Sequence, residues 1–232
     1  ILMTYGLPDQ PRHPLLHSSS LNSLINLDRP YHTPLRMEHM HFFRPGFVAE
    51  LRKRVDAYVT ELLDAMEKQG PVVDMVEMFS AELPLFTLCE ILGVPAADRP
   101  KLVHWMHFLE TSQYRAQQEG LGNVTPEEMM EFINEIQAMF DFGRHLLAER
   151  RKEPKEDLLS AIANVEIDGK PLSPEFLDGS WLLIVFAGND TTRNSLSGTM
   201  RLLTEFPDQK AKLQANPDLF PNFVHEAIRM VS

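Results

Sequence analysis

The sequence has little of what several classes of protein require. A single cysteine among 232 residues rules out an intrachain disulfide and fits a reducing compartment, so we expect a cytoplasmic protein. The longest apolar run, from Trp181 to Ala187, is far shorter than the roughly 20 residues that cross a bilayer. The first ten residues lack a basic segment followed by a long apolar core. We therefore expect no secretory signal and no membrane anchor.

Basic residues are also scarce. The sequence has 22 Lys and Arg against 33 Asp and Glu, and its net charge of −11 argues against a nucleic-acid partner. It contains no Gly-rich phosphate loop and no nucleophile elbow. His104 with His107, and His39 with His41, are closely spaced, but no carboxylate or cysteine completes a metal-ligand set. Cys89 lies on an apolar helix face and is expected to be a buried structural thiol.

Helical periodicity is what the sequence does have, and it predicts a mainly α protein with a single domain over residues 1–232. Residues 1–27 are expected to be irregular, with at most a short helix near 21–27. Thr125 followed by Pro126 and Glu128 predicts a capped helix start, and Asp168-Gly169 predicts a hairpin turn. The other segments with helical spacing are 32–43, 47–69, 80–92, 98–114, 125–152, 157–164, 208–215 and 220–231.

The chain is organised around residues 175–206, which no proline interrupts. We expect one helix of about 30 residues, roughly 45 Å long. Its apolar first half predicts burial in the core. Ala187 and Gly188 are small and would let a flat or bulky group approach the helix. A buried Asp190 would cost several kcal/mol of desolvation without partners, so the stretch indicates a site.

Asp190 and Thr191 are candidate catalytic residues. Thr191 can bond back to the carbonyl of Ala187, or leave that carbonyl free and bend the helix. A hydroxyl and a carboxylate around one groove would form a proton relay. The alternative is a buried polar cluster satisfied by neighbouring helices, and the spacing alone leaves both interpretations open.

Two further pairs stand at helical spacing. His32 and Arg36 are four residues apart and share a helix face, where two donors suit carboxylates or a phosphate; a solvated surface pair is the alternative. Glu226 and Arg229 are three apart and can form an ion pair. The apolar neighbours of this second pair, Val224 and Ile228, predict a partly buried helix, where such a pair needs further partners.

The order of these motifs resembles the cytochrome P450 superfamily in its soluble bacterial form. Its central helix carries a small residue, Gly, any residue, an acid and Thr, as do residues 187–191 here. Its His-x-x-x-Arg and Glu-x-x-Arg motifs match His32 with Arg36 and Glu226 with Arg229. The resemblance implies a P450-like helical domain with a minor β hairpin, truncated at both ends. The family's Cys-bearing haem loop would follow Ser232, so Cys89 is given no ligand role and the chain is expected to supply no metal ligand.

The resemblance implies a haem-thiolate monooxygenase that binds haem b and activates O2. Asp190 and Thr191 would be catalytic, Asp190 by carrying protons inward and Thr191 by bonding to bound dioxygen. Glu226 and Arg229 would brace the fold. The residues expected to contact the cofactor are His32 and Arg36 at its propionates, and Ala187, Gly188 and Thr191 beside the macrocycle.

The same resemblance implies partners and a substrate class. Electrons would come from NAD(P)H through a ferredoxin or similar donor, docking near Arg36. The substrate would be a small apolar molecule such as a fatty acid, alkane, terpenoid or steroid side chain, and residues 187–194 resemble relatives that oxidise long alkyl chains or steroid side chains. The alternative is that these 232 residues form a non-catalytic helical fragment, unable on its own to bind haem as a thiolate complex. A helical ligand-binding regulator would need a DNA-reading helix, which the charge does not support.

Overall fold

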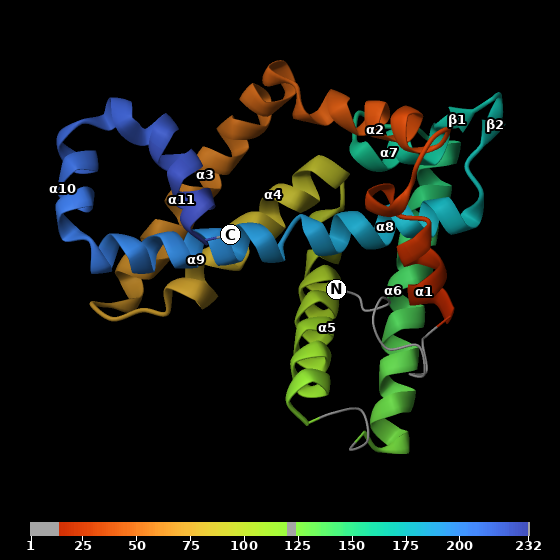
Figure 1. Cartoon of the computed structure of the whole chain (residues 1–232), viewed down its shortest axis with the longest axis horizontal. Helices are drawn as coiled ribbons and strands as arrows, with labels where there is room; N and C mark the ends of the chain where they lie inside the picture. The colour runs from red at the N-terminus through yellow and green to blue at the C-terminus, as the bar shows by residue number, and fades with distance from the viewer. Residues whose placement is uncertain (1–13, 120–123, 232) are drawn as a thin grey trace. The chain divides into compact units, whose positions relative to one another are not determined.

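A computed structural model describes residues 14–119 and 124–231 of the chain, which are almost entirely helical (Figure 1). One small antiparallel hairpin pairs β1 (Glu166–Ile167) with β2 (Lys170–Pro171). No helix among the described residues is both long and apolar enough to cross a bilayer. The α-helices are α1 (Pro14–Leu21), α2 (His32–Met40), α3 (Pro45–Gln69), α4 (Glu82–Leu92), α5 (Arg99–Glu119), α6 (Pro126–Lys152), α7 (Leu158–Asn164), α8 (Pro174–Ala187), α9 (Asp190–Glu205), α10 (Pro207–Ala215) and α11 (Phe220–Val231). Short 3-10 turns η1 (Leu24–Asn26), η2 (His41–Phe43), η4 (Ala96–Asp98) and η6 (Pro217–Leu219), and a π-helical turn η3 (Val76–Ser80), lie between them.

The local start and turn signals of the sequence are confirmed. Thr125 caps α6 as a capping box: its Oγ1 accepts from the Glu128 amide at 3.2 Å, and Glu128 Oε2 accepts from the Thr125 amide at 3.0 Å. Asp168 and Gly169 both have positive φ, 52° and 71°, as a two-residue type I′ hairpin turn requires. These signals depend on residues close in sequence, which is why the pattern alone reveals them.

The chain divides into two compact units. The first contains the residues up to 51 and residues 89–186, and the second contains residues 52–88 and those from 187 onward. In the first unit, α6 packs on α7, and α2 packs on α7. The fully buried side chains of this unit's core include Leu35, Leu102, Ile136, Met139, Phe140, Leu159, Ile162, Trp181 and Val185.

In the first unit, α8 is attached to α6 through Trp181. The indole is 1% exposed, and its Nε1 donates to the Met139 carbonyl at 3.1 Å. Gly143 makes room for the ring, because a Cβ built there would lie 2.6 Å from three ring carbons. Real Cβ atoms essentially never come that close, so the glycine sets how deeply the indole can sit on α6.

An ion pair between the same two helices stands beside the indole. Arg144 Nε donates to Asp178 Oδ1 at 3.0 Å and its Nη2 donates to Oδ2 at 2.7 Å, a two-pronged geometry. The Asp178 side chain is 8% exposed, whereas that of Arg144 is 40% exposed. A nearly buried carboxylate therefore depends on one guanidinium for its charge balance.

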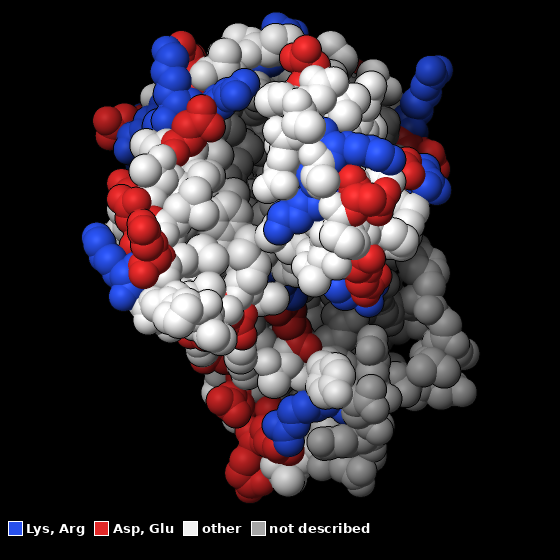
Figure 2. Space-filling model, turned by 90° about the vertical axis from the view of Figure 1, so that its left-hand side faces the viewer, with Lys and Arg blue, Asp and Glu red and all other residues white. Residues whose placement is uncertain are grey.

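The second unit is stabilised by an aromatic stack, a side-chain hydrogen bond and a close approach of two helices. The Tyr58 ring stacks on Phe86 with centroids 4.1 Å apart, and its hydroxyl donates to Glu82 at 3.1 Å. Between α9 and α11, Gly198 lies so close to Val231 that an added Cβ would approach its Cγ1 to 2.7 Å. One side of α11 is nonetheless exposed, and uncharged side chains form a broad area between scattered charges in Figure 2. The exposed apolar residues of α11 include Phe220, Val224 and Ile228.

Two sequence-based expectations about elements are wrong. The single helix over residues 175–206 is two helices, α8 and α9, separated by a turn at Gly188-Asn189. Glycine is the least helix-favouring residue there apart from proline, and the Thr191 hydroxyl bonds back to the Ala187 carbonyl at the same point. A helix, α1, occupies residues 14–21 where irregular structure was expected, whereas the 3-10 turn η1 agrees with the expectation of at most a short helix near residues 21–27. Part of the 1–27 expectation lies outside the described residues.

We predict that Arg144→Gln destabilises the protein by about 2–4 kcal/mol, because it leaves the nearly buried Asp178 carboxylate without its partner. Urea denaturation followed by circular dichroism measures the change. The matched control is Asp141→Asn, which removes the exposed carboxylate 3.4 Å from the same guanidinium and should cost roughly 0.5 kcal/mol or less. Equal effects of the two variants would contradict the assignment.

Candidate functional site

The site begins at the break between α8 and α9. Ala187 is the last residue of α8, Gly188 and Asn189 form a turn, and Asp190 is the first residue of α9. The Thr191 hydroxyl donates to the Ala187 carbonyl at 3.0 Å. The carbonyl is therefore engaged by the hydroxyl, which is the first of the two expected arrangements. The hydroxyl oxygen keeps its lone pairs and can accept a further hydrogen bond.

Asp190 is satisfied by its own helix. Its Oδ1 accepts from Arg193 Nη2 at 2.7 Å and from Asn194 Nδ2 at 3.2 Å. The Asp190 side chain is 50% exposed, and that of Arg193 is 22% exposed. The expectation of a buried acid is thus wrong, and so is the alternative of a polar cluster satisfied by neighbouring helices. The carboxylate lies at the start of a helix, where the helix dipole also favours negative charge.

Two residues at the break have small side chains. Ala187 is exposed and Gly188 is half-buried, so the small side chains expected beside a flat group do lie at the surface of the turn. The Asn189 side chain that follows is buried, and its Oδ1 has no hydrogen-bond partner among the described residues. This geometry suits close approach of a planar group, because no side chain larger than a methyl projects from the two residues before Asn189.

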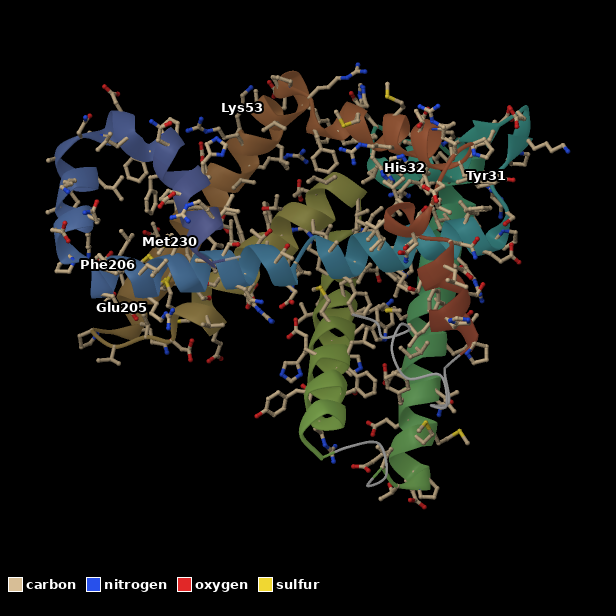
Figure 3. The ribbon with its side chains drawn as sticks, in the orientation of Figure 1. Tyr31, His32, Lys53, Glu205, Phe206 and Met230 are labelled. Atoms are coloured by element: carbon tan, nitrogen blue, oxygen red, sulfur yellow. The ribbon has the colours of Figure 1, made fainter. Side chains whose placement is uncertain are left out.

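His32 and Arg36 share one face of α2 in the first unit. His32, labelled in Figure 3, is half-buried at the helix start. Arg36 is exposed. Leu35, about 60° from His32 around the helix axis, is fully buried and anchors α2 in the first unit. The sequence-based prediction did not include a third residue on this face of α2. This residue, His39, lies within about 60° of His32 and Arg36 around the helix axis. His39 is 8% exposed, and its Nε2 has no hydrogen-bond partner among the described residues.

Burial, helped by the positive charge of Arg36, lowers the pKa of His39 from 6.5 to about 4. The imidazole is therefore neutral at physiological pH. The donors that α2 can offer an anion are then the Arg36 guanidinium and the His32 ring, as expected from the spacing, with His39 as a buried polar group beneath them.

Glu226 and Arg229 form the expected pair on α11 in the second unit. Arg229 donates through Nε and Nη2 to the two carboxylate oxygens at 2.7 and 2.6 Å. The hydrogen bond from Arg229 lowers the pKa of Glu226 below its ordinary value. The helix face is not partly buried as predicted, because the side chains of Glu226 and Arg229 are 58% and 66% exposed and Val224 and Ile228 are about half exposed. An exposed pair of this kind is screened by solvent and contributes little to stability.

The one cysteine is chemically quiet. Cys89 is 0% exposed on α4, and burial raises the pKa of its thiol from 9.0 to about 11. A thiol that stays protonated is neither a nucleophile nor a metal ligand, so Cys89 is the buried structural residue that the sequence indicated. Within residues 14–119 and 124–231, no group of three His, Cys, Asp or Glu side chains is placed to hold a metal ion.

Sequence reasoning missed the residues that hold the acid. Arg193 and Asn194 stand three and four positions after Asp190, the spacing at which helix side chains meet. The spacing was a usable signal, but the assumption of a buried Asp190 directed attention to other helices.

Comparison with known proteins gives the family. No family model matches the chain. Linalool 8-monooxygenase of Pseudomonas putida is 31% identical over 208 residues, which cover 90% of this chain and 49% of that protein. Methyl-branched lipid omega-hydroxylase of Mycobacterium tuberculosis is 30% identical over 216 residues, covering 90% of this chain and 48% of that protein. Cytochrome P450 CYP268A2 of Mycobacterium marinum, solved in complex with pseudoionone, superposes with a TM-score of 0.74 at 33% identity, covering 88% of this chain and 48% of that one.

The helical architecture and the three ordered motifs agree with these matches, and the chain belongs to the cytochrome P450 superfamily. The chain spans about half the length of the curated relatives it matches. The mainly α, P450-like fold expected from the sequence is confirmed.

We predict that His39 makes stability depend on pH between about 6.5 and 4. The unfolded imidazole takes up a proton near pH 6.5 and the folded one only near pH 4, so the unfolded state binds more protons in this range. Stability should therefore fall as pH drops through it, by up to about 3 kcal/mol. Urea midpoints at several pH values measure the slope. His39→Leu should flatten the slope, whereas His41→Gln, at an exposed neighbour, should leave it unchanged; an unchanged slope in His39→Leu would contradict the prediction.

Proposed function

We propose that the chain is part of a haem-dependent monooxygenase that inserts one oxygen atom of O2 into an apolar organic substrate. The observation that carries the proposal is the break at Gly188-Asn189, where a threonine hydroxyl and a carboxylate stand on adjacent residues beside two small ones. Membership of the P450 superfamily supports the same reaction class, since relatives include monooxygenases. On this proposal both compact units belong to one P450-type domain over residues 1–232.

The residues present fit haem on the side that this chain supplies. Ala187 is exposed and Gly188 is half-buried, and their small side chains let a flat macrocycle lie close to the backbone there. Arg36 and His32 offer donors from one helix face, which suit the two carboxylates of haem b. When bound, haem would supply the oxygen chemistry, and a thiolate from a Cys-bearing loop would hold its iron. Cys89 does not fit that role, because it is fully buried on α4.

The chain's own residues would manage protons. The Thr191 hydroxyl donates to Ala187, so its oxygen is oriented with lone pairs free to accept a hydrogen bond, and it can pass on a proton as it takes another. Asp190 is half exposed at the adjacent position, where it can exchange protons with solvent. An acid open to water next to a positioned hydroxyl is the arrangement a proton relay requires. Glu226 and Arg229 would brace the fold without touching substrate.

We propose a substrate with a branched apolar chain. Two relatives are named for linalool and for methyl-branched lipids, and the compared structure holds pseudoionone. These ligands share methyl-branched hydrocarbon chains. A terpenoid or a branched fatty acyl chain therefore comes before an unbranched alkane or a steroid side chain among the substrates to test.

The reaction would also need an electron donor. We propose a ferredoxin or similar protein that delivers electrons from NAD(P)H and docks near the exposed Arg36 of α2. A cytoplasmic location would fit such a donor and the single cysteine.

A second proposal concerns these 232 residues alone, and the buried Cys89 favours it. Without an available thiolate, the chain should take up haem only weakly and without the absorption band of a thiolate-ligated, carbon-monoxide-bound haem. We expect that band in the parent enzyme that includes the Cys-bearing loop. Reduced, carbon-monoxide-treated samples of both proteins give the spectra. A thiolate band from the 232-residue chain would refute this proposal, and its absence from the parent would refute the monooxygenase proposal.

We predict that Thr191→Ala in the haem-loaded parent enzyme leaves substrate affinity within about twofold and lowers product formed per O2 consumed by roughly 10-fold or more, because the relay loses its hydroxyl. Product, peroxide and oxygen uptake are measured together. The control is Thr192→Ala, at the exposed neighbouring position, which should keep wild-type coupling. Equal coupling in the two variants would count against the relay.

A further inference from the structure

Arg193 is the principal partner of the acid at the helix break. Its Nη2 lies 2.7 Å from Asp190 Oδ1, against 3.2 Å for the amide of Asn194. Both bonds end on a carboxylate, but only the shorter one also joins opposite charges, so the arginine contact dominates. With its side chain 22% exposed, Arg193 is also better shielded from water than an ordinary surface arginine.

The contact exists because the central helix is broken. Asp190 is the first residue of α9, and positions three and four later on a helix face back toward it. Asn189, the residue before, makes no capping hydrogen bond through its side chain. The orientation of the carboxylate is therefore set by side chains from within α9.

Both hydrogen bonds end on the same oxygen of Asp190. Oδ1 accepts two hydrogen bonds, so among the described residues Oδ2 is the oxygen left to exchange a proton with water. Holding one oxygen fixes the side-chain rotamer and hence the direction in which the other points. A relay acid that is free to rotate would spend much of its time in unproductive orientations.

We propose that Arg193 is a positioning residue of the proton relay, which holds Asp190 by Oδ1 and presents Oδ2 for proton transfer toward Thr191. This inference rests on the proposed function. In each transfer Oδ2 accepts one proton from water and releases one proton inward, so the carboxylate ends unchanged. Arg193 remains protonated throughout and donates only its hydrogen bond. Asn194 supports the same rotamer through its weaker contact.

The first experiment tests the geometry on the 232-residue chain without cofactor. In nitrogen-15 spectra, a guanidinium held by a carboxylate rotates slowly and shows separate Nη signals. We expect separate signals for Arg193, and a change in the positions of its Nη signals in Asp190→Ala together with a shift of the Asn194 side-chain amide. Arg201 is the internal control, because its pair with Glu205 is 3.7 Å long and its side chain is 74% exposed. Arg193 signals unaffected by Asp190→Ala would overturn the inference.

The second experiment tests the role in the haem-loaded parent enzyme. Arg193→Gln should lower product per O2 consumed by roughly 3- to 10-fold and raise the solvent deuterium isotope effect, with substrate affinity unchanged. Arg193→Lys, which keeps a cationic donor, should restore part of the coupling. Arg201→Gln removes an arginine–acid pair from the same helix away from Asp190, and should behave as wild type.

The two failures are distinguishable. If the parent lacks a thiolate-type haem spectrum, the proposed function fails, while the spectra of the first experiment still report on the Arg193–Asp190 contact. If the haem spectrum is present and Thr191→Ala uncouples the enzyme, but Arg193→Gln matches Arg201→Gln in coupling and isotope effect, the positioning role is overturned and the proposed function stands.

Discussion

The packing of Trp181 on Gly143 is the contact on which the first unit depends. It joins the middle of α8 to the middle of α6, buries the largest side chain of the core, and leaves no space for even one added carbon at Gly143. The indole hydrogen bond to Met139 fixes the ring's rotation, because an N–H buried without a partner would cost about 1–3 kcal/mol. The Arg144–Asp178 pair then fixes the same two helices along their length. Two directional contacts beside a close-packed ring permit one register of α8 on α6.

Because the register of α8 on α6 is fixed, the point along α6 at which α8 ends is fixed as well. The apolar residues up to Phe186 belong to the first unit, and the polar residues that follow belong to the second. Gly188 allows the backbone to leave the helix at this point, and Thr191 satisfies the carbonyl at the end of α8 with its side chain. The break is therefore satisfied locally, and it costs less than an interruption that left an unpaired carbonyl in a buried helix.

Much of the fold was predictable because most helix boundaries depend on short-range chemistry. The Thr125 capping box and the Asp168-Gly169 turn are examples, since each is closed by residues within three positions. The ion pair of Glu226 and Arg229 was predictable for the same reason. Contacts between elements distant in sequence were not, and the seat of Trp181 on Gly143 joins residues 38 positions apart. No periodicity in one helix can report on a partner in another.

The sequence nominated residues for the candidate site, and their membership stays a prediction, but it did not predict their electrostatics. Asp190, Thr191, His32 and Arg36 were identified from spacing and from the resemblance, yet the acid was expected to be buried. A continuous helix would have placed it among apolar residues, and only the break reveals that it begins a new helix. The prediction that Val224 and Ile228 are partly buried is wrong for a related reason. The sequence pattern shows which helix face is apolar, but not what covers that face.

An exposed acid at a helix start is physically the better choice for moving protons. A fully buried carboxylate would have to be desolvated, which disfavours its charged form and isolates it from water. At the start of α9 the carboxylate keeps contact with solvent, gains from the helix dipole, and needs only Arg193 and Asn194 to fix its direction. On the proposed function, five consecutive residues then supply the surroundings of the acid, and the buried thiol of Cys89 takes no part in proton delivery.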